Sequence, residues 1–185
     1  MKSINNFIIE KLHINKNIKN KQIEYFPKDF KELKKIITKR ALDSNDGVLD
    51  LNDIDISKIT NLSYLFENIN NIKSVNMNDW DTSKVTDIHG LFWCNKSIEK
   101  IYINDWNTNN IESFYGTFYD CENLKTLDLS KWKFDKCKEI DLMFANCSKL
   151  DLSFTKNWDI DTNKVNCGDT FRNCNNPPKW YKLQM

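Results

Sequence analysis

The stretch that decides the fold is residues 72–97, IKSVNMNDWDTSKVTDIHGLFWCNKS, because the chain then repeats its pattern three more times. The next two copies read IEKIYINDWNTNNIESFYGTFYDCEN and LKTLDLSKWKFDKCKEIDLMFANCSK. One tryptophan marks the same place in every copy, 26 residues apart each time: Trp80, Trp106, Trp132 and Trp158. A fixed period of this length is typical of one structural unit that is copied and stacked, which predicts a solenoid.

Each copy carries two kinds of apolar spacing. The Leu-x-x-Leu-x-Leu pattern that begins at Leu124 predicts a short strand with alternate side chains pointing inward. Ile140, Met143 and Phe144 have the spacing of one helical turn, and a hydroxyl residue such as Thr86 stands where it could cap that turn. Each coil is therefore expected to contain a strand, a corner, a short helix and a return.

The copies resemble the BspA-like leucine-rich repeat of bacterial surface proteins, a 26-residue repeat also associated with Mycoplasma lipoprotein-like chains of unknown function. The family pattern is roughly L-x-x-L-D-L-S-x-W-D-T-S-x-V-T-N-M-S-x-M-F-x-x-C. Residues 124–147 follow it at both ends, and Trp80 to Thr86 follow its middle. The resemblance covers residues 48–176. It implies an α/β, right-handed, leucine-rich-repeat-like solenoid with adhesion or protein-binding roles, and it transfers no catalytic residue.

Three segments are expected. Residues 1–47 form a helical N-terminal segment or cap, residues 48–176 form a repeat solenoid of about five coils, and residues 177–185 form a C-terminal tail. A first helix is predicted around residues 4–12; it could dock on the core or act as a detachable peptide. A second helix from near Pro27 past Lys39 is expected to cover the open apolar end of the stack. Trp180 and Tyr181 are expected to fold back over the other end.

The composition limits the classes of partner and the cellular locations that are expected. The chain has 27 basic and 26 acidic residues, a net charge of +1, so nucleic-acid binding, which needs a basic face, is not expected. Residues 1–48 hold more basic than acidic side chains, which favours a solvated helix face over a contact with RNA or an acidic partner. The sequence shows neither a long apolar span nor a signal peptide, so no membrane partner is expected. A cytoplasmic location is predicted, or one in a phage particle or infected host cell; the cell surface would require that a signal had been removed.

The cysteines, histidines and corner acids could suggest a metal or catalytic site, but their spacing favours a structural role. None of the six cysteines forms a C-x-x-C pair, and His13 and His89 lie far from any zinc spacing. Buried free thiols are expected, with a disulfide or a metal site as alternatives. His89 occupies an outward position without a matching nucleophile, so no catalytic residue, cofactor or metal is predicted. The corner residues Asp81, Asn107 and Asp159 are expected to bond backbone amides.

Recognition is expected on the outward positions of the strands, because these residues do not hold the fold. They form two columns: Asp50, Asn76, Tyr102 and Asp128, then Asn52, Asn78, Asn104 and Ser130. Tyr102 is an amphipathic aromatic of the kind that anchors interfaces. Two alternatives stay open: these positions are merely solvated, or the convex aromatics Tyr64, Trp93, Tyr115 and Tyr119 form the contact surface.

The sequence thus predicts a non-enzymatic module that binds a protein partner through a solenoid face. Two alternatives remain: a phage or mobile-element inhibitor that blocks a host protein, and a surface adhesin that lacks its export signal. Because both ends of the stack are expected to be capped, a monomer is favoured over an oligomer.

Overall fold

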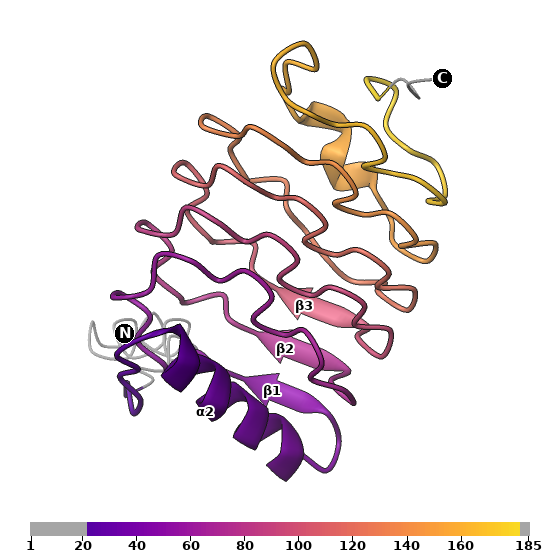
Figure 1. The fold of residues 1–185 in the computed structure, drawn as a ribbon. Helices are drawn as coiled ribbons and strands as arrows, with labels where there is room; N and C mark the ends of the chain where they lie inside the picture. Colours follow the sequence, from indigo (N-terminus) through magenta and orange to yellow (C-terminus); the bar gives the residue numbers. More distant parts are fainter. Residues whose placement is uncertain (1–21, 182–185) are drawn as a thin grey trace, which may run out of the picture.

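The computed structural model describes residues 22–181, and in it successive copies of the repeat form coils that stack on one another (Figure 1). Three copies contribute a short parallel strand to one sheet, in the order β1 (Val48–Asp50), β2 (Ser74–Asn76) and β3 (Lys100–Tyr102). The register advances by one repeat, so Leu49 pairs with Val75 and Val75 with Ile101. The first predicted helix, around residues 4–12, lies outside the described residues.

The sheet is shorter than the five strands that five copies would supply. The fourth copy adds one bridge, between Lys100 and Thr126, and within residues 22–181 the fifth adds none on this side. A second column of single parallel bridges runs through the other side of all the coils and joins Asn61, Asp87, Ser113, Glu139 and Asn166. The two columns together fix each coil to its neighbours.

Aromatic rings form the centre of the core. The repeat phenylalanines are buried and stack in sequence, with centroid distances of 4.6 Å for Phe66–Phe92 and 5.9 Å for Phe92–Phe118. Trp80, Trp106 and Trp132 also stack, and the indole N–H groups of all four repeat tryptophans reach back one coil. Trp80 Nε1 donates to the carbonyl of Leu51 at 2.8 Å and Trp106 Nε1 to that of Met77 at 2.7 Å. Each tryptophan therefore packs as a core residue and also satisfies a strand carbonyl.

The short helix predicted after each corner is replaced by a run of tight turns. The N–H groups of Leu62 and Tyr64 donate to Asp87 and His89 in the next coil, whereas Leu65 N–H donates back to Leu62. One equivalent position in each of four successive coils has positive φ: Tyr64, Gly90, Gly116 and Leu142. A residue in the left-handed region interrupts a right-handed helix. Turns keep the apolar spacing of a helical turn but direct alternate N–H groups to the neighbouring coil.

The helix α2 (Phe30–Asp43) covers the start of the stack, as predicted. Asp29 caps it by accepting from Glu32 N–H at 2.9 Å, and Leu33 and Ile37 are fully buried in the core. Arg40 ties the helix to the first coil because its guanidinium forms a two-pronged ion pair with the carboxylate of Asp53. Because the pair is partly buried, losing one partner would destabilise the protein by leaving the other charge uncompensated.

The far end of the stack is closed by the C-terminal residues, also as predicted. Tyr181 is buried against Phe171 with ring centroids 5.0 Å apart, and its hydroxyl donates to the Gly168 carbonyl. Trp180 Nε1 donates to the Thr155 carbonyl at 3.0 Å. Thr155 belongs to a short 3-10 helix, η2 (Ser153–Asn157), which stands where the fifth copy would have its strand.

Replacing Trp106 with Phe tests the role of the indole bond. Trp106→Phe removes the donor to Met77 and leaves a small cavity, so we expect a loss of about 2 kcal/mol in the free energy of unfolding. Urea denaturation followed by far-UV circular dichroism measures it. The control is Tyr102→Phe, at an exposed ring, which should change stability by less than about 0.5 kcal/mol. Equal stability of the two variants would contradict this role.

Candidate functional site

The predicted recognition residues lie on the strand face, but their exposure differs. Tyr102 is 39% exposed, the largest apolar side chain among them. The other members of both columns divide into exposed ones and half-buried ones. Asp50, Asp128 and Ser130 are exposed, and Asn76, Asn78 and Asn104 are half-buried. Asn52 is only 5% exposed, so its prediction as an outward recognition residue is wrong.

The second column is used in part to hold the fold. Asn52 Oδ1 accepts from Asp79 N–H at 2.9 Å, and Asn78 Oδ1 accepts from Asp105 N–H, also at 2.9 Å. Each asparagine therefore bonds the backbone of the coil 26 residues later. Because this contact joins two coils, it cannot be predicted from the asparagine alone. Of the second column, Asn104 and Ser130 remain as surface positions.

In the first column, the acids and amides are engaged in local turns. The side-chain oxygens of Asp50, Asn76 and Asp128 each accept the N–H of the residue two positions later, at 2.9 to 3.2 Å. The fourth member, Tyr102, breaks this pattern with a large aromatic ring. This substitution in one copy out of four distinguishes the middle of the face from its ends.

Tyr102 stands between two shallow hollows of the face. The first lies over β1 to β3 and includes Val48, Asn76 and Lys100. The second continues toward the last coil and includes Leu127 and Phe154. An exposed ring with a hollow on each side can insert between side chains of a partner, while its neighbours exclude water.

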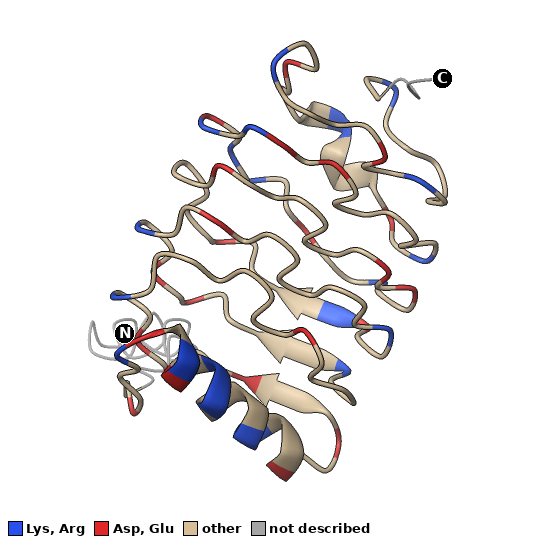
Figure 2. Cartoon of the chain, viewed as in Figure 1, with Lys and Arg blue, Asp and Glu red and all other residues tan. Residues whose placement is uncertain are grey.

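Charge is spread along the stack rather than gathered on the strand face. Figure 2 shows acidic and basic residues interspersed over the coils, with a concentration of basic residues on α2. Exposed lysines pair with acids in the adjacent coil, as in Lys125–Glu99 at 3.0 Å and Lys131–Asp105 at 2.5 Å. The lysine hydrogen bonds lower the pKa of both Glu99 and Asp105. Such exposed pairs contribute little to stability.

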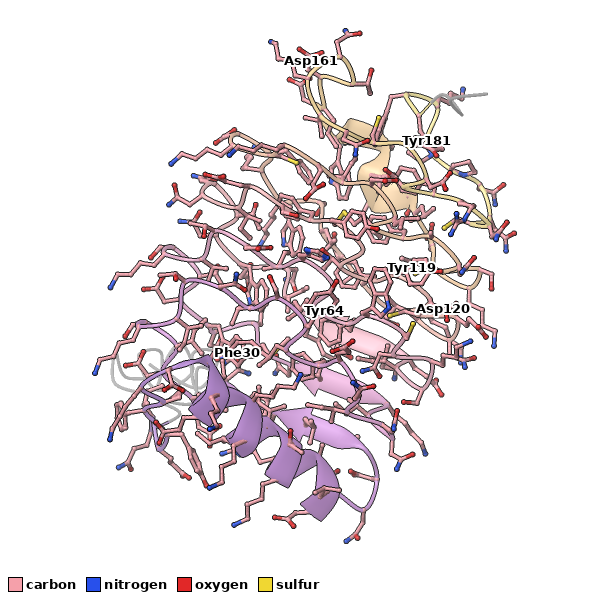
Figure 3. The ribbon with its side chains drawn as sticks, viewed as in Figure 1. Phe30, Tyr64, Tyr119, Asp120, Asp161 and Tyr181 are labelled. Atoms are coloured by element: carbon pink, nitrogen blue, oxygen red, sulfur yellow. The ribbon has the colours of Figure 1, made fainter. Side chains whose placement is uncertain are left out.

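The convex aromatics form a cluster whose rings contact one another. Tyr64, His89, Trp93, Tyr115 and Tyr119 are all half-buried, and Trp93 stacks on Tyr119 with centroids 4.3 Å apart. Tyr64 Oη and His89 Nε2 lie 2.7 Å apart, and partial burial raises the pKa of the Tyr64 phenol. Figure 3 labels Tyr64 and Tyr119, which come from coils that are not adjacent. The rings of the cluster cover much of one another's surface, and Tyr64 is a structural partner for His89.

Two glycines make this cluster possible. A Cβ atom at Gly90 would lie 2.3 Å from the Tyr64 ring, and one at Gly116 would lie 2.4 Å from the Trp93 ring. Both glycines also have positive φ. The rings therefore lie directly on the backbone of the next coil, a feature that the sequence reasoning missed although the two glycines share one repeat position.

Two of the three corner residues that were predicted to bond backbone amides do so. Asp81 Oδ1 accepts from Ser83 N–H at 3.0 Å, and Asn107 Oδ1 accepts from Asn109 N–H at 3.1 Å. Within residues 22–181 Asp159 accepts no such bond; Asp161 accepts from the Asn163 N–H two residues on instead. The last coil has one extra residue between its tryptophan and phenylalanine, which lengthens this corner and moves the turn along the chain.

The cysteines are free thiols, and three of them form a column. The Sγ atoms of Cys121, Cys147 and Cys174 donate to phenylalanine carbonyls of the preceding coil at 3.3, 3.0 and 2.8 Å. Burial raises the pKa of Cys174 to about 11, and it raises that of Cys147 well above its ordinary value. In residues 22–181 no group of three or more His, Cys, Asp or Glu side chains could hold a metal ion.

Thiol reactivity should therefore be limited to one site. Cys94 is exposed, so reagent can reach it, although burial of part of the side chain raises its pKa; the column thiols are covered, and burial raises the pKa of Cys174 to about 11. We expect one fast-reacting thiol with Ellman's reagent in the native protein and six after denaturation. Cys94→Ser should remove the fast phase. A fast phase that persists in this variant would show that the thiol column is open to solvent.

Comparison with known proteins identifies a family but no individual relative. The family model described as Mycoplasma protein of unknown function, DUF285, matches residues 60–180, which include the turns, tryptophans and thiol column described above. No curated protein and no solved structure matches the chain. No helix in the described part of the chain has the length and apolar character needed to cross a membrane. Because the family model covers well over half of the sequence, the chain belongs to the Mycoplasma protein family of unknown function DUF285.

Proposed function

We propose that the chain is a non-catalytic interaction module that binds a protein partner through the strand face, with Tyr102 at the centre of the contact. The observation that carries the proposal is the position of Tyr102. Its ring is 39% exposed between two hollows, in a column whose other members are short residues engaged in turns. Exposed tyrosines of this kind are enriched among the residues that dominate binding energy.

The finer fold assignment belongs to the same proposal. We infer a right-handed, leucine-rich-repeat-like solenoid of the BspA-like type over residues 48–176. The 26-residue parallel register of β1 to β3 and the family match within residues 60–180 support it. In such a stack the strand face is continuous and backed by the buried core, so it changes little on binding. A rigid surface loses little conformational entropy when it meets a partner.

The other surfaces fit recognition less well. The aromatic cluster around Trp93 consists of rings that already stack on one another, and His89 is paired with Tyr64. The exposed pairs between coils, such as Lys125–Glu99, satisfy each other's charge. By contrast, the Tyr102 hydroxyl has no hydrogen-bond partner in residues 22–181, so it is available to a ligand. These contrasts favour the strand face.

The test is capture of a partner from lysate of the native host, followed by affinity measurement with the purified partner. Tyr102→Ala should weaken binding at least tenfold, because truncating an aromatic anchor costs about 2 kcal/mol or more. The matched control is Leu42→Ala, an apolar side chain that is 81% exposed on α2. Unchanged affinity for Tyr102→Ala with a loss for Leu42→Ala would assign binding to the helix instead.

A further inference from the structure

An open groove of about 1260 Å³ lies between the last coil and the C-terminal segment of the described chain. One wall comes from residues 148–157 and the other from residues 175–180. Two hydrogen bonds join the walls. Trp180 Nε1 donates to the Thr155 carbonyl at 3.0 Å, and Asn175 Nδ2 donates to the Ser148 carbonyl at 2.6 Å. The protein's own bonds therefore hold the groove in shape, as is usual for small-molecule sites.

The lining of the groove includes apolar side chains and one indole ring. Leu150 and Leu152 are buried, and Trp180 is half-buried. The Trp180 ring meets the rings of Phe171 and Tyr181 at 73° and 86°, so neither lies parallel to it. The repeat tryptophans, by contrast, stack on one another at 6° and 8°. A half-buried indole with no parallel ring beside it in residues 22–181 can stack on a flat ring of a ligand.

Lysines without a carboxylate partner also line the groove. Lys149, Lys156 and Lys179 are exposed, the first two on one wall and the third on the other. The ammonium group of Lys149 donates to the neutral side-chain amide of Asn123. Within residues 22–181 the ammonium groups of Lys156 and Lys179 form no ion pair or hydrogen bond. Three positive charges are thus available on opposite sides of the groove.

The charge of the groove stays positive when the nearby carboxylates are counted. These three lysines against the carboxylate of Asp151, the acid of the lining, leave a net charge of +2. A fourth lysine of the lining, Lys125, is not counted because it pairs with Glu99 at 3.0 Å. Including Asp128 of the adjoining hollow beside Tyr102 still leaves +1. A ligand with several negative charges complements this balance.

We propose that this groove binds a nucleoside polyphosphate, with the base stacked on Trp180 and the phosphates between Lys149, Lys156 and Lys179. The ligand class follows from the two features together. A flat base matches the indole, and a chain of phosphates supplies negative charge to lysines on both walls. Lysine recognises phosphate as a point charge on a flexible stem, so exposed lysines suit this task. The proposal concerns a second site and does not rest on the proposed function of the strand face.

Isothermal titration calorimetry of the full-length protein with ATP, without divalent metal, tests the proposal directly. We expect a dissociation constant below about 1 mM at low ionic strength. Adenosine, which lacks the phosphates, and inorganic tripolyphosphate, which lacks the base, should each bind at least about tenfold more weakly. No binding at about 5 mM ATP would overturn the proposal. Equal affinity for ATP and tripolyphosphate would also overturn it, because the base would then make no contact.

Charge-reversal variants separate the groove from a general attraction for anions. Lys156→Glu combined with Lys179→Glu changes two exposed side chains whose ammonium groups make no bonds in residues 22–181, so the fold should persist. ATP should bind this variant at least about tenfold more weakly. The matched control is Lys35→Glu combined with Lys39→Glu, the same charge change at exposed positions of α2, which should stay within about twofold of wild type. Equal weakening by both pairs would contradict a site in the groove.

Discussion

Neighbouring coils in residues 22–181 are joined by backbone hydrogen bonds between positions about 26 residues apart, and the other features follow from that pairing. The bonds run on two sides of the stack, through β1 to β3 and through the column that begins at Asn61. Buried backbone groups that lack partners are costly, so the coils stay in register. The tryptophan indoles, the Asn52 and Asn78 amides and the cysteine thiols add further bonds between the same coils.

The parts of this structure that depend on periodicity could be predicted from the sequence. The buried tryptophans, the helix α2 and the closure by Tyr181 follow from spacing, capping residues and the need to cover apolar ends. The turns that replace the short helices could not, because the same apolar spacing serves both and the left-handed residues include Tyr64 and Leu142, which carry no such signal. The burial of Asn52 was missed for another reason, since it depends on a bond to the next coil.

The candidate site was predictable in position but not in its details. Alternation along the strands places Tyr102 on the outward face, where the structure has it. The hollow beside it results from the last coil leaving the strand path. Ser153 and Thr155 signal that departure when the copies are aligned on their tryptophans, although only the structure shows that a 3-10 helix replaces the strand. Alternation of side chains along the strands thus predicts which residues face outward, but not the shape of the surface between them.

The measurement that tests this account most directly is amide hydrogen exchange of the free protein at single-residue resolution. The account predicts that the amides of Leu51, Met77 and Ile101, which donate into the next coil, exchange slowly. The amides of Ser83 and Asn109, which bond only a nearby side chain at the exposed corners, should exchange at least about tenfold faster. Equally fast exchange of all five amides would contradict the claim that backbone bonds to the next coil hold the stack together.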